Sequence, residues 1–168
     1  METVVVNTSG GITGGDCFDL DLIAEEGASL TITTQAAERA YRAQPGEVGT
    51  FTTRLTARDG AYLRWLPQEL ILFERCNLQR RLTVDLDPTA RFLMVEPMVF
   101  GRAAMGETLR DVRFSDRIKI TRNGRPIYVD GIDLEGDAAA NLGRAATAAG
   151  ALAMCSVVMI TPDAVQRL

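Results

Sequence analysis

Histidine is absent from this 168-residue sequence, and its absence excludes several kinds of site. An imidazole is the usual general base of Ser-His-Asp and Cys-His nucleophiles, so the chain alone builds neither of them. Imidazole and thiolate are also the usual ligands of zinc and other firmly held transition metals, and no Cys-x-x-Cys pair is present. We therefore expect no catalytic residue, no tightly bound cofactor and no permanent metal site. Weak ligation by Asp and Glu oxygens stays open.

Cysteine and long apolar runs are also scarce, and acidic residues outnumber basic ones. Cys17, Cys76 and Cys155 are odd in number and far apart, which suits reduced cytoplasmic thiols better than a disulfide framework. No apolar run is long enough to span a membrane, and the N-terminus lacks the basic flank and cleavage site of a secretory signal. A formal charge of −4 speaks against nucleic acid or an anionic membrane as a partner. The length suits a single domain over residues 1–168.

What is present begins with a glycine-rich segment, Asn7-Thr8-Ser9-Gly10-Gly11-Ile12-Thr13-Gly14-Gly15-Asp16. Glycine pairs this dense mark backbone that takes positive φ or lets another segment approach closely. The flanks, Val4-Val5-Val6 and the alternating run from Phe18 to Leu22, are typical of strands. A phosphate-binding loop instead precedes a helix and often ends in lysine. The context favours a tight connection between two strands over a nucleotide site.

Alternation of apolar and polar residues recurs along most of the chain and predicts a mainly β protein. It marks strands at Leu30–Thr33, Phe51–Ala57, Leu78–Leu86, Ile118–Ile120 and Ile127–Val129. Arg80 interrupts the apolar face of the third of these runs. Asn123-Gly124 predicts a hairpin turn between the last two. The only long helical candidate is Asp137–Ala149, with Asp137 as a possible N-cap and Gly150 as its stop.

A faint internal repeat suggests how the strands are arranged. Gly27-Ala28-Ser29-Leu30 recurs 33 residues later as Gly60-Ala61-Tyr62-Leu63, and a looser third copy begins at Thr89-Ala90-Arg91-Phe92. A unit of this length that cannot bury its own apolar face predicts stacked β-layers, as in a solenoid or β-helix. Coincidence among short matches remains the alternative.

Stacked layers would gather polar residues at one rim of a sheet. Gln35, Gln68 and Glu96 are expected along that rim, which continues into Tyr41-Arg42, Glu74-Arg75 and residues 101–107. Arg42 and Arg75 keep the same 33-residue offset. Such a rim suits contact with another protein, although ordinary strand-ending turns have the same composition.

Several motifs in this order resemble the UreD (UreH) family of urease accessory proteins over nearly the whole chain. They are the Asn7–Asp16 segment, Thr34–Arg42, Trp65-Leu66-Pro67-Gln68-Glu69 running into Ile71-Leu72-Phe73, Leu78-Gln79-Arg80-Arg81-Leu82, and Val95–Glu107 with its Gly-Arg-Ala-Ala-Met-Gly-Glu ending. The resemblance implies helically stacked β-sheets with one or two short helices. It also implies that the domain is incomplete and lacks N-terminal strands and a C-terminal portion of the family.

The function that the resemblance implies is urease maturation rather than catalysis. The chain would bind apo-urease and a second accessory protein, and a nickel-handling GTPase would join through that complex. Nickel would pass transiently along a tunnel lined partly by acidic residues. The candidates for that path or for partner contacts are Asp16, Glu69, Glu96, Arg102 and Glu107. Each is otherwise a solvated or salt-bridged surface charge.

Two further functions stay open. A β-helix hydrolase of carbohydrates would use paired carboxylates such as Asp19 and Asp21, which share one face of a predicted strand. A glycosidase groove also needs stacking aromatics, and the chain has one Trp and three Tyr. The other alternative is an unrelated β-rich interaction domain.

Overall fold

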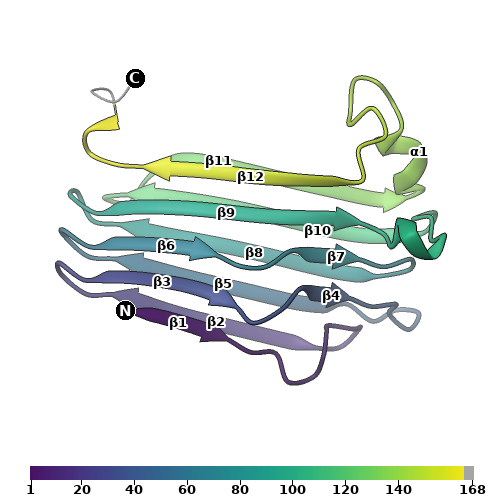
Figure 1. The fold of residues 1–168 in the computed structure, drawn as a ribbon, viewed down its shortest axis with the longest axis horizontal. Coiled ribbons are helices and arrows are strands. Elements are labelled where there is room, and N and C mark those ends of the chain that lie inside the picture. Colours follow the sequence, from purple (N-terminus) through teal and green to yellow (C-terminus); the bar gives the residue numbers. More distant parts are fainter. Residues whose placement is uncertain (165–168) are drawn as a thin grey trace.

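The computed structural model describes residues 1–164 and is built almost entirely of β-strands in two stacked sheets (Figure 1). The strands are β1 Glu2–Val5, β2 Cys17–Ala24, β3 Ser29–Thr34, β4 Glu38–Ala40, β5 Gly49–Ala57, β6 Tyr62–Leu66, β7 Leu70–Leu72, β8 Asn77–Leu86, β9 Arg91–Phe100, β10 Val112–Arg122, β11 Arg125–Gly136 and β12 Ala153–Ile160. A 3₁₀ turn, η1 Ala103–Met105, and one helix, α1 Ala138–Leu142, complete the described part. The prediction of a mainly β chain with one or two short helices is confirmed.

The chain alternates between the sheets as it climbs the stack. One sheet has the order β1-β3-β6-β9 with β4 and β7 continuing the same layers, and the other has the order β2-β5-β8-β10. Neighbours within each of these rows are parallel, so each coil of the chain lies on the previous one, as in a β-solenoid.

The predicted repeat is this coil. Leu30 of β3 pairs with Leu63 of β6, and Leu63 pairs with Phe92 of β9, so the three matched segments lie in adjacent layers. All three side chains are buried between the sheets. The prediction of stacked layers is confirmed, including its looser third copy.

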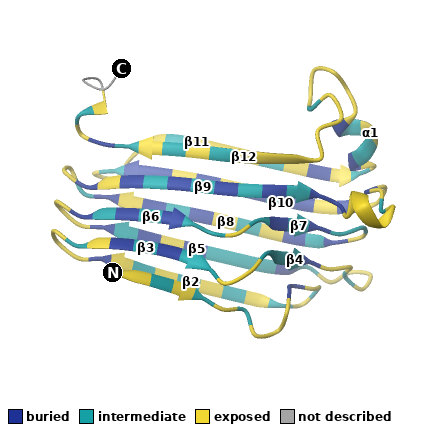
Figure 2. Ribbon diagram, viewed as in Figure 1, coloured by how far each residue is buried: buried dark blue, intermediate teal, exposed yellow. Residues whose placement is uncertain are grey.

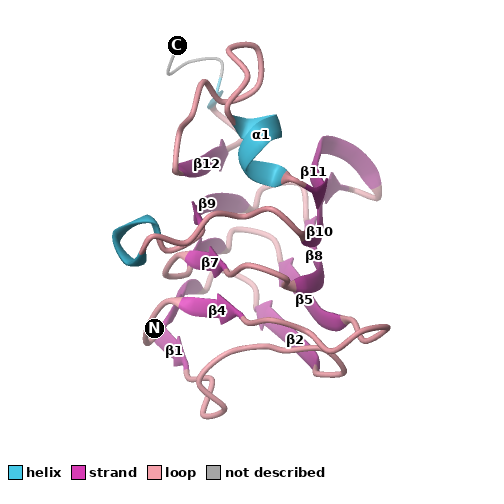
Figure 3. Cartoon of the chain, turned by 90° about the vertical axis from the view of Figure 1, so that its right-hand side faces the viewer, coloured by secondary structure: helices cyan, strands magenta, loops and turns pink. Residues whose placement is uncertain are grey.

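Two antiparallel strands complete the upper end of the stack. β11 pairs with β10 through the predicted hairpin at Asn123-Gly124, where both residues have positive φ, as a type I′ turn requires. β12 returns along β9 in the other sheet. Figure 3, seen roughly along the strands, shows β11 and β12 above the parallel coils on opposite sides.

The glycine-rich segment connects β1 to β2, as predicted. Gly10 has φ +80, whereas a Cβ on Gly11 would lie 2.3 Å from the Tyr41 ring. Gly14 approaches Glu47 in the same way, and Gly15 has φ +84. In each glycine pair, therefore, one glycine has positive φ and the other lies where a side chain would collide with a neighbouring segment.

The interior between the sheets contains two hydrophobic clusters, which follow the alternation of each strand (Figure 2). Along β9, Phe92 and Met94 belong to one cluster, Met98 and Phe100 belong to the other, and Glu96 lies between them. The residues that alternate with these five along β9 face outward.

The predicted helix is shorter than expected. Asp137 is the N-cap and accepts a hydrogen bond from the amide of Ala140, as predicted. However, α1 ends at Gly143 rather than at Gly150, and residues 143–150 form turns. Glycine is a poor helix residue, so the helix stops at the first glycine. Among residues 1–164, no helix has the length and hydropathy to cross a membrane.

Candidate functional site

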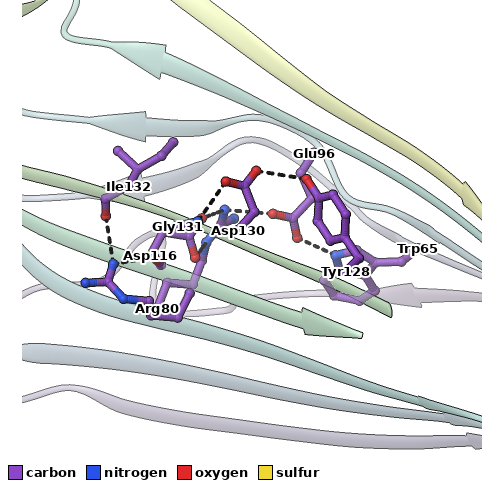
Figure 4. A network of polar contacts seen from close by, with 9 residues as sticks. Trp65, Arg80, Glu96, Asp116, Tyr128, Asp130, Gly131 and Ile132 are labelled. Carbon is purple, nitrogen blue, oxygen red and sulfur yellow. Dashed lines mark hydrogen bonds and ion pairs between the residues drawn. The ribbon is translucent and has the colours of Figure 1, made fainter. Parts of the chain in front are cut away.

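A layer of charged side chains crosses the apolar interior of the solenoid. Arg80 of β8, Glu96 of β9 and Asp116 of β10 point inward from adjacent coils, together with Trp65 of β6 (Figure 4). Each of the charged residues stands at an inward position of its strand, where the alternation otherwise places an apolar residue. The layer separates the two hydrophobic clusters.

The contacts in this polar layer are short and satisfy the buried groups. Arg80 Nη2 lies 2.7 Å from Glu96 Oε2, and Arg80 Nε donates to Asp116 Oδ1 at 3.1 Å. The indole N–H of Trp65 donates to the other oxygen of Glu96 at 2.6 Å. The carboxylate side chains are 5% and 4% exposed and that of Arg80 is 15% exposed, so water contributes little to their solvation.

The layer has two carboxylates for one guanidinium. Burial alone would lower the pKa of Arg80, but the attraction of Glu96 and Asp116 outweighs it and the pKa of Arg80 is raised. With both carboxylates ionised, the three side chains have a net charge of −1.

A narrow crevice borders the polar layer on the side of β11 and β12. It has a volume of about 10 Å³ and is lined by Arg80, Glu96 and Asp116 together with residues of β11 and β12. Asp130 lies on its wall and accepts hydrogen bonds from Tyr128 Oη and the amide of Gly131 (Figure 4). Burial and the hydrogen bond to Asp130 raise the pKa of Tyr128. The crevice has room for about one water molecule.

Glu96 does not lie on the predicted rim. Gln35 and Gln68 are exposed at connections between strands, but Glu96 is in the middle of a strand and faces the interior. The prediction failed because β9 continues through Pro97 to Phe100. On one side, β9 pairs with β6 through residues 91–94 and with β7 through residues 98–100. Pro97 lies between these two paired segments, so no neighbouring strand there needs the amide hydrogen that proline lacks.

The remaining part of the rim does form one cluster. Tyr41, Phe73 and Arg102 follow the ends of β4, β7 and β9 in successive coils. The rings of Tyr41 and Phe73 pack edge to face at 4.9 Å, and the Arg102 guanidinium lies 4.2 Å from the Phe73 ring centre. Arg102 makes a two-pronged pair with Glu107, at 3.1 and 2.9 Å. Its hydrogen bonds lower the pKa of Glu107.

The other two candidate acids lie elsewhere. Asp16 is half-buried in the turn before β2, where its carboxylate accepts the amide of Thr13. Glu69 is half-buried between β6 and β7, and its backbone carbonyl accepts the amide of Glu38. The five predicted residues therefore fall into separate places, and only Arg102 and Glu107 contact each other. Within residues 1–164, no three His, Cys, Asp or Glu side chains gather in a metal-binding group.

Sequence reasoning missed Arg80, Asp116 and Trp65 as parts of one site. The signal in the sequence is a charged residue on an otherwise apolar strand face. Arg80 interrupts such a face, and Asp116 interrupts another between Phe114 and Ile118. An arginine and an acid on inward faces of neighbouring strands indicate a buried ion pair. The pairing of β8 with β10, which places Arg80 opposite Asp116, was needed to see it.

The carboxylates considered for a hydrolase are on the outer surface of β2. Asp19 and Asp21 share one exposed face, as predicted. Asp19 forms an exposed ion pair with Arg54 of the neighbouring strand, at 3.2 Å. A glycosidase places its two carboxylates on either side of a bound sugar, whereas Asp19 and Asp21 lie side by side on an exposed strand face.

Comparison with known proteins assigns the sequence to a family. The sequence model described as "UreD urease accessory protein" matches residues 1–168. The chain belongs to the UreD family. The resemblance found in its motifs is thereby confirmed.

Relatives within the UreD family are similar along the whole chain. The chain is 52% identical over 168 residues to the urease accessory protein UreD of Roseobacter denitrificans. These residues are 100% of this chain and 62% of that protein. The corresponding protein of Ruegeria pomeroyi is 51% identical over 164 residues, covering 98% and 64%. Urease accessory protein UreD 1 of Brucella melitensis biotype 1 is 47% identical over 168 residues, covering 100% and 60%. The chain thus spans about three-fifths of the length of these UreD relatives.

Proposed function

We propose that this UreD-family chain acts in urease maturation as a docking component without catalytic activity. It binds apo-urease and a second accessory protein, and a nickel-handling GTPase joins through that complex. Its place of action is the cytoplasm. The names of the relatives support the role in urease maturation, and the partners follow from the family resemblance.

The observation that best supports docking is the outer face of β9 and β12. Four cross-strand pairs lie on this face and all are apolar: Ala153 with Val99, Cys155 with Pro97, Val157 with Val95, and Met159 with Leu93. Val157 is 64% exposed and Met159 is 53% exposed. The charged residue on this face of β9 is Arg91, at the start of the strand and outside the four pairs. A contiguous apolar patch of this kind is typical of a surface that another polypeptide covers.

Transient passage of nickel is the second part of the proposal. The polar layer has two carboxylates for one guanidinium, and the crevice beside Asp130 borders it. Carboxylate oxygens hold Ni²⁺ more weakly than imidazole or thiolate does, which suits release rather than storage. Because Arg80 occupies both carboxylates, a cation that enters the layer has to displace its guanidinium. The acids Asp16, Glu69 and Glu107 lie outside this layer and remain candidates for partner contacts.

Co-expression with a urease operon tests the proposal. We expect the affinity-tagged chain to retain urease subunits or another accessory protein, and to convert neither urea nor polysaccharide on its own. The Asp19→Asn/Asp21→Asn variant should retain the same partners as the parent chain. Association with no urease component, or release of reducing sugar that this variant loses, would contradict the proposal.

A further inference from the structure

A cleft at one end of the strands, running across successive coils, gathers three arginines that the ion pairs described above do not use. It has a volume of about 290 Å³ and lies between the β4–β5 connection, the turn before β8 and the start of β10. Arg42, Arg75 and Arg113 line it, and all three are exposed. Within residues 1–164, no carboxylate forms an ion pair with any of them.

The backbone holds these three residues in a fixed frame. Arg42 forms an isolated antiparallel bridge with Cys76, and the amide of Ala43 donates to the carbonyl of Arg75 at 3.0 Å. The amide of Arg113 donates to the carbonyl of Cys76 at 2.9 Å. The arginines therefore come from three adjacent layers, which in β-structure lie roughly 4.8 Å apart.

The opposite wall of the cleft is also anchored. Asn77 Nδ2 donates to the carbonyl of Glu47 at 2.7 Å and ties down the loop that contains Gln44, Pro45 and Gly46. The loop that forms this wall of the cleft is therefore held in place by a hydrogen bond.

Among residues 1–164, no acid near the cleft forms an ion pair with the arginines, although Glu135 stands opposite Arg113 in the ladder of β10 and β11. Glu107 is paired with Arg102, and Glu74 accepts the amides of Arg110 and Asp111. Among the described residues, Asp111 is the one carboxylate in the cleft wall. Three guanidinium groups against one carboxylate leave the cleft positively charged in a chain whose formal charge is −4.

Arg75 also has an unusual backbone conformation. Its φ is +64°, a left-handed conformation that costs a residue with a side chain free energy and that glycine adopts readily. Among the described residues, Asn123 and Ala149 are the other non-glycine residues with positive φ, so Arg75 is the one charged side chain held in this way.

We propose that this arginine cleft binds an acidic segment of a partner protein through carboxylate side chains. A guanidinium matches a carboxylate with two parallel hydrogen bonds, and three of them spread over about 10 Å suit several carboxylates of an extended segment better than one small anion. The proposal deepens the docking role and depends on it for the partner, but the binding itself needs no urease component.

The test uses the full chain and a fluorescein-labelled hexaglutamate peptide, with anisotropy measured at low and at moderate ionic strength. We expect saturable binding of one peptide per chain, at least tenfold weaker in the Arg42→Gln/Arg75→Gln variant. The matched control, Arg58→Gln/Arg125→Gln, changes the same charge at exposed positions at the opposite end of the strands and should bind within twofold of the parent.

Arg75→Gly separates binding from folding. Glycine relieves the left-handed strain, so this variant should be at least as stable as the parent to urea and yet bind the peptide several-fold more weakly. Equal loss of binding in the cleft variant and the control, or unchanged binding by Arg75→Gly, would overturn the proposal. Displacement of the peptide by inorganic phosphate, but not by chloride at equal ionic strength, would also overturn it in favour of a small-oxyanion site. A failure to copurify with urease leaves each of these outcomes unchanged.

Discussion

Trp65 donates its indole N–H to Glu96 at 2.6 Å inside the solenoid, between side chains that belong to adjacent coils. Trp65 is the single tryptophan of the chain, so its fluorescence reports on the polar layer directly. Glu96 connects it to Arg80, and Arg80 connects Glu96 to Asp116. Unfolding of the layer and of the surrounding core can therefore be followed with one intrinsic probe.

Removing the shared cation should be costly. Arg80→Met leaves Glu96 and Asp116 buried without their counter-charge, and we expect the free energy of unfolding to fall by about 3–5 kcal/mol. Urea denaturation followed by Trp65 fluorescence measures it. Arg81→Met, an exposed neighbour on the same strand, is the control and should change stability by less than ~0.5 kcal/mol. A loss below ~1 kcal/mol in Arg80→Met would show that the layer is not a coupled ion-pair network.

Replacing the whole layer by apolar side chains should restore stability. In Arg80→Met/Glu96→Leu/Asp116→Leu no charge is left buried, so we expect stability within ~1 kcal/mol of the parent or above it. If the triple variant is as unstable as Arg80→Met, packing rather than charge explains the loss. The comparison also shows whether the layer exists for stability or, as the proposal holds, for function.

The Arg102–Glu107 pair predicts a loss of stability in acid. The pKa of Glu107 is lowered in the folded chain from the usual 4.5, because Arg102 donates hydrogen bonds to it. Its contribution to stability is complete above pH 4.5 and disappears as the pH falls through the lower folded value. The parent should therefore be more stable than Glu107→Gln at pH 7, and the difference should shrink on acidification. A difference independent of pH would contradict an ionised pair.

The cysteines should differ sharply in reactivity. Burial raises the pKa of the Cys76 thiol to about 12, whereas Cys17 and Cys155 are exposed. Because the thiolate is the reactive form, a disulfide reagent at pH 8 should modify two thiols quickly and the third only after denaturation. Cys76→Ser should leave the fast phase unchanged. Rapid modification of all three thiols in the folded chain would show that the turn before β8 opens.

The close approach of Gly11 to Tyr41 predicts that a side chain at position 11 lowers the stability of the fold. In Gly11→Ala the new Cβ would lie 2.3 Å from the Tyr41 ring and 2.7 Å from the Arg39 carbonyl oxygen. We expect a loss of about 1–3 kcal/mol in the free energy of unfolding, since one of the two coils has to move. Ser9→Ala, at an exposed position of the same loop, should be nearly neutral. Equal stability of the two variants would contradict the tight packing of this loop.

The layered architecture could be predicted because it depends on short-range patterns in the sequence. The Gly27 and Gly60 segments repeat once per coil, and alternation gave most inward faces correctly. The position of Glu96 could not be obtained in this way, since the repeat grouped it with Gln35 and Gln68 at the rim of the sheet. Only the pairing of β9 with β6, β7 and β12 explains why that strand continues.

The candidate site was less predictable than the fold for a related reason. Its charged members, Arg80, Glu96 and Asp116, lie on three strands, and their contacts depend on register between coils. Arg102 and Glu107 were grouped correctly because they are five residues apart and belong to one motif. The helix beyond Gly143 was over-predicted, because small residues favour a helix without securing one against a glycine.

The most direct test of the docking role compares two valine variants in the co-expression experiment. Val157→Lys places a charge on the apolar outer face of β12, whereas Val129→Lys does so at a similarly exposed position, 69% exposed, on β11 of the other sheet. The measured quantity is the amount of urease and accessory protein retained per tagged chain. We predict that Val157→Lys loses most of it and that Val129→Lys retains as much as the parent. Equal retention by both variants would contradict docking through this face.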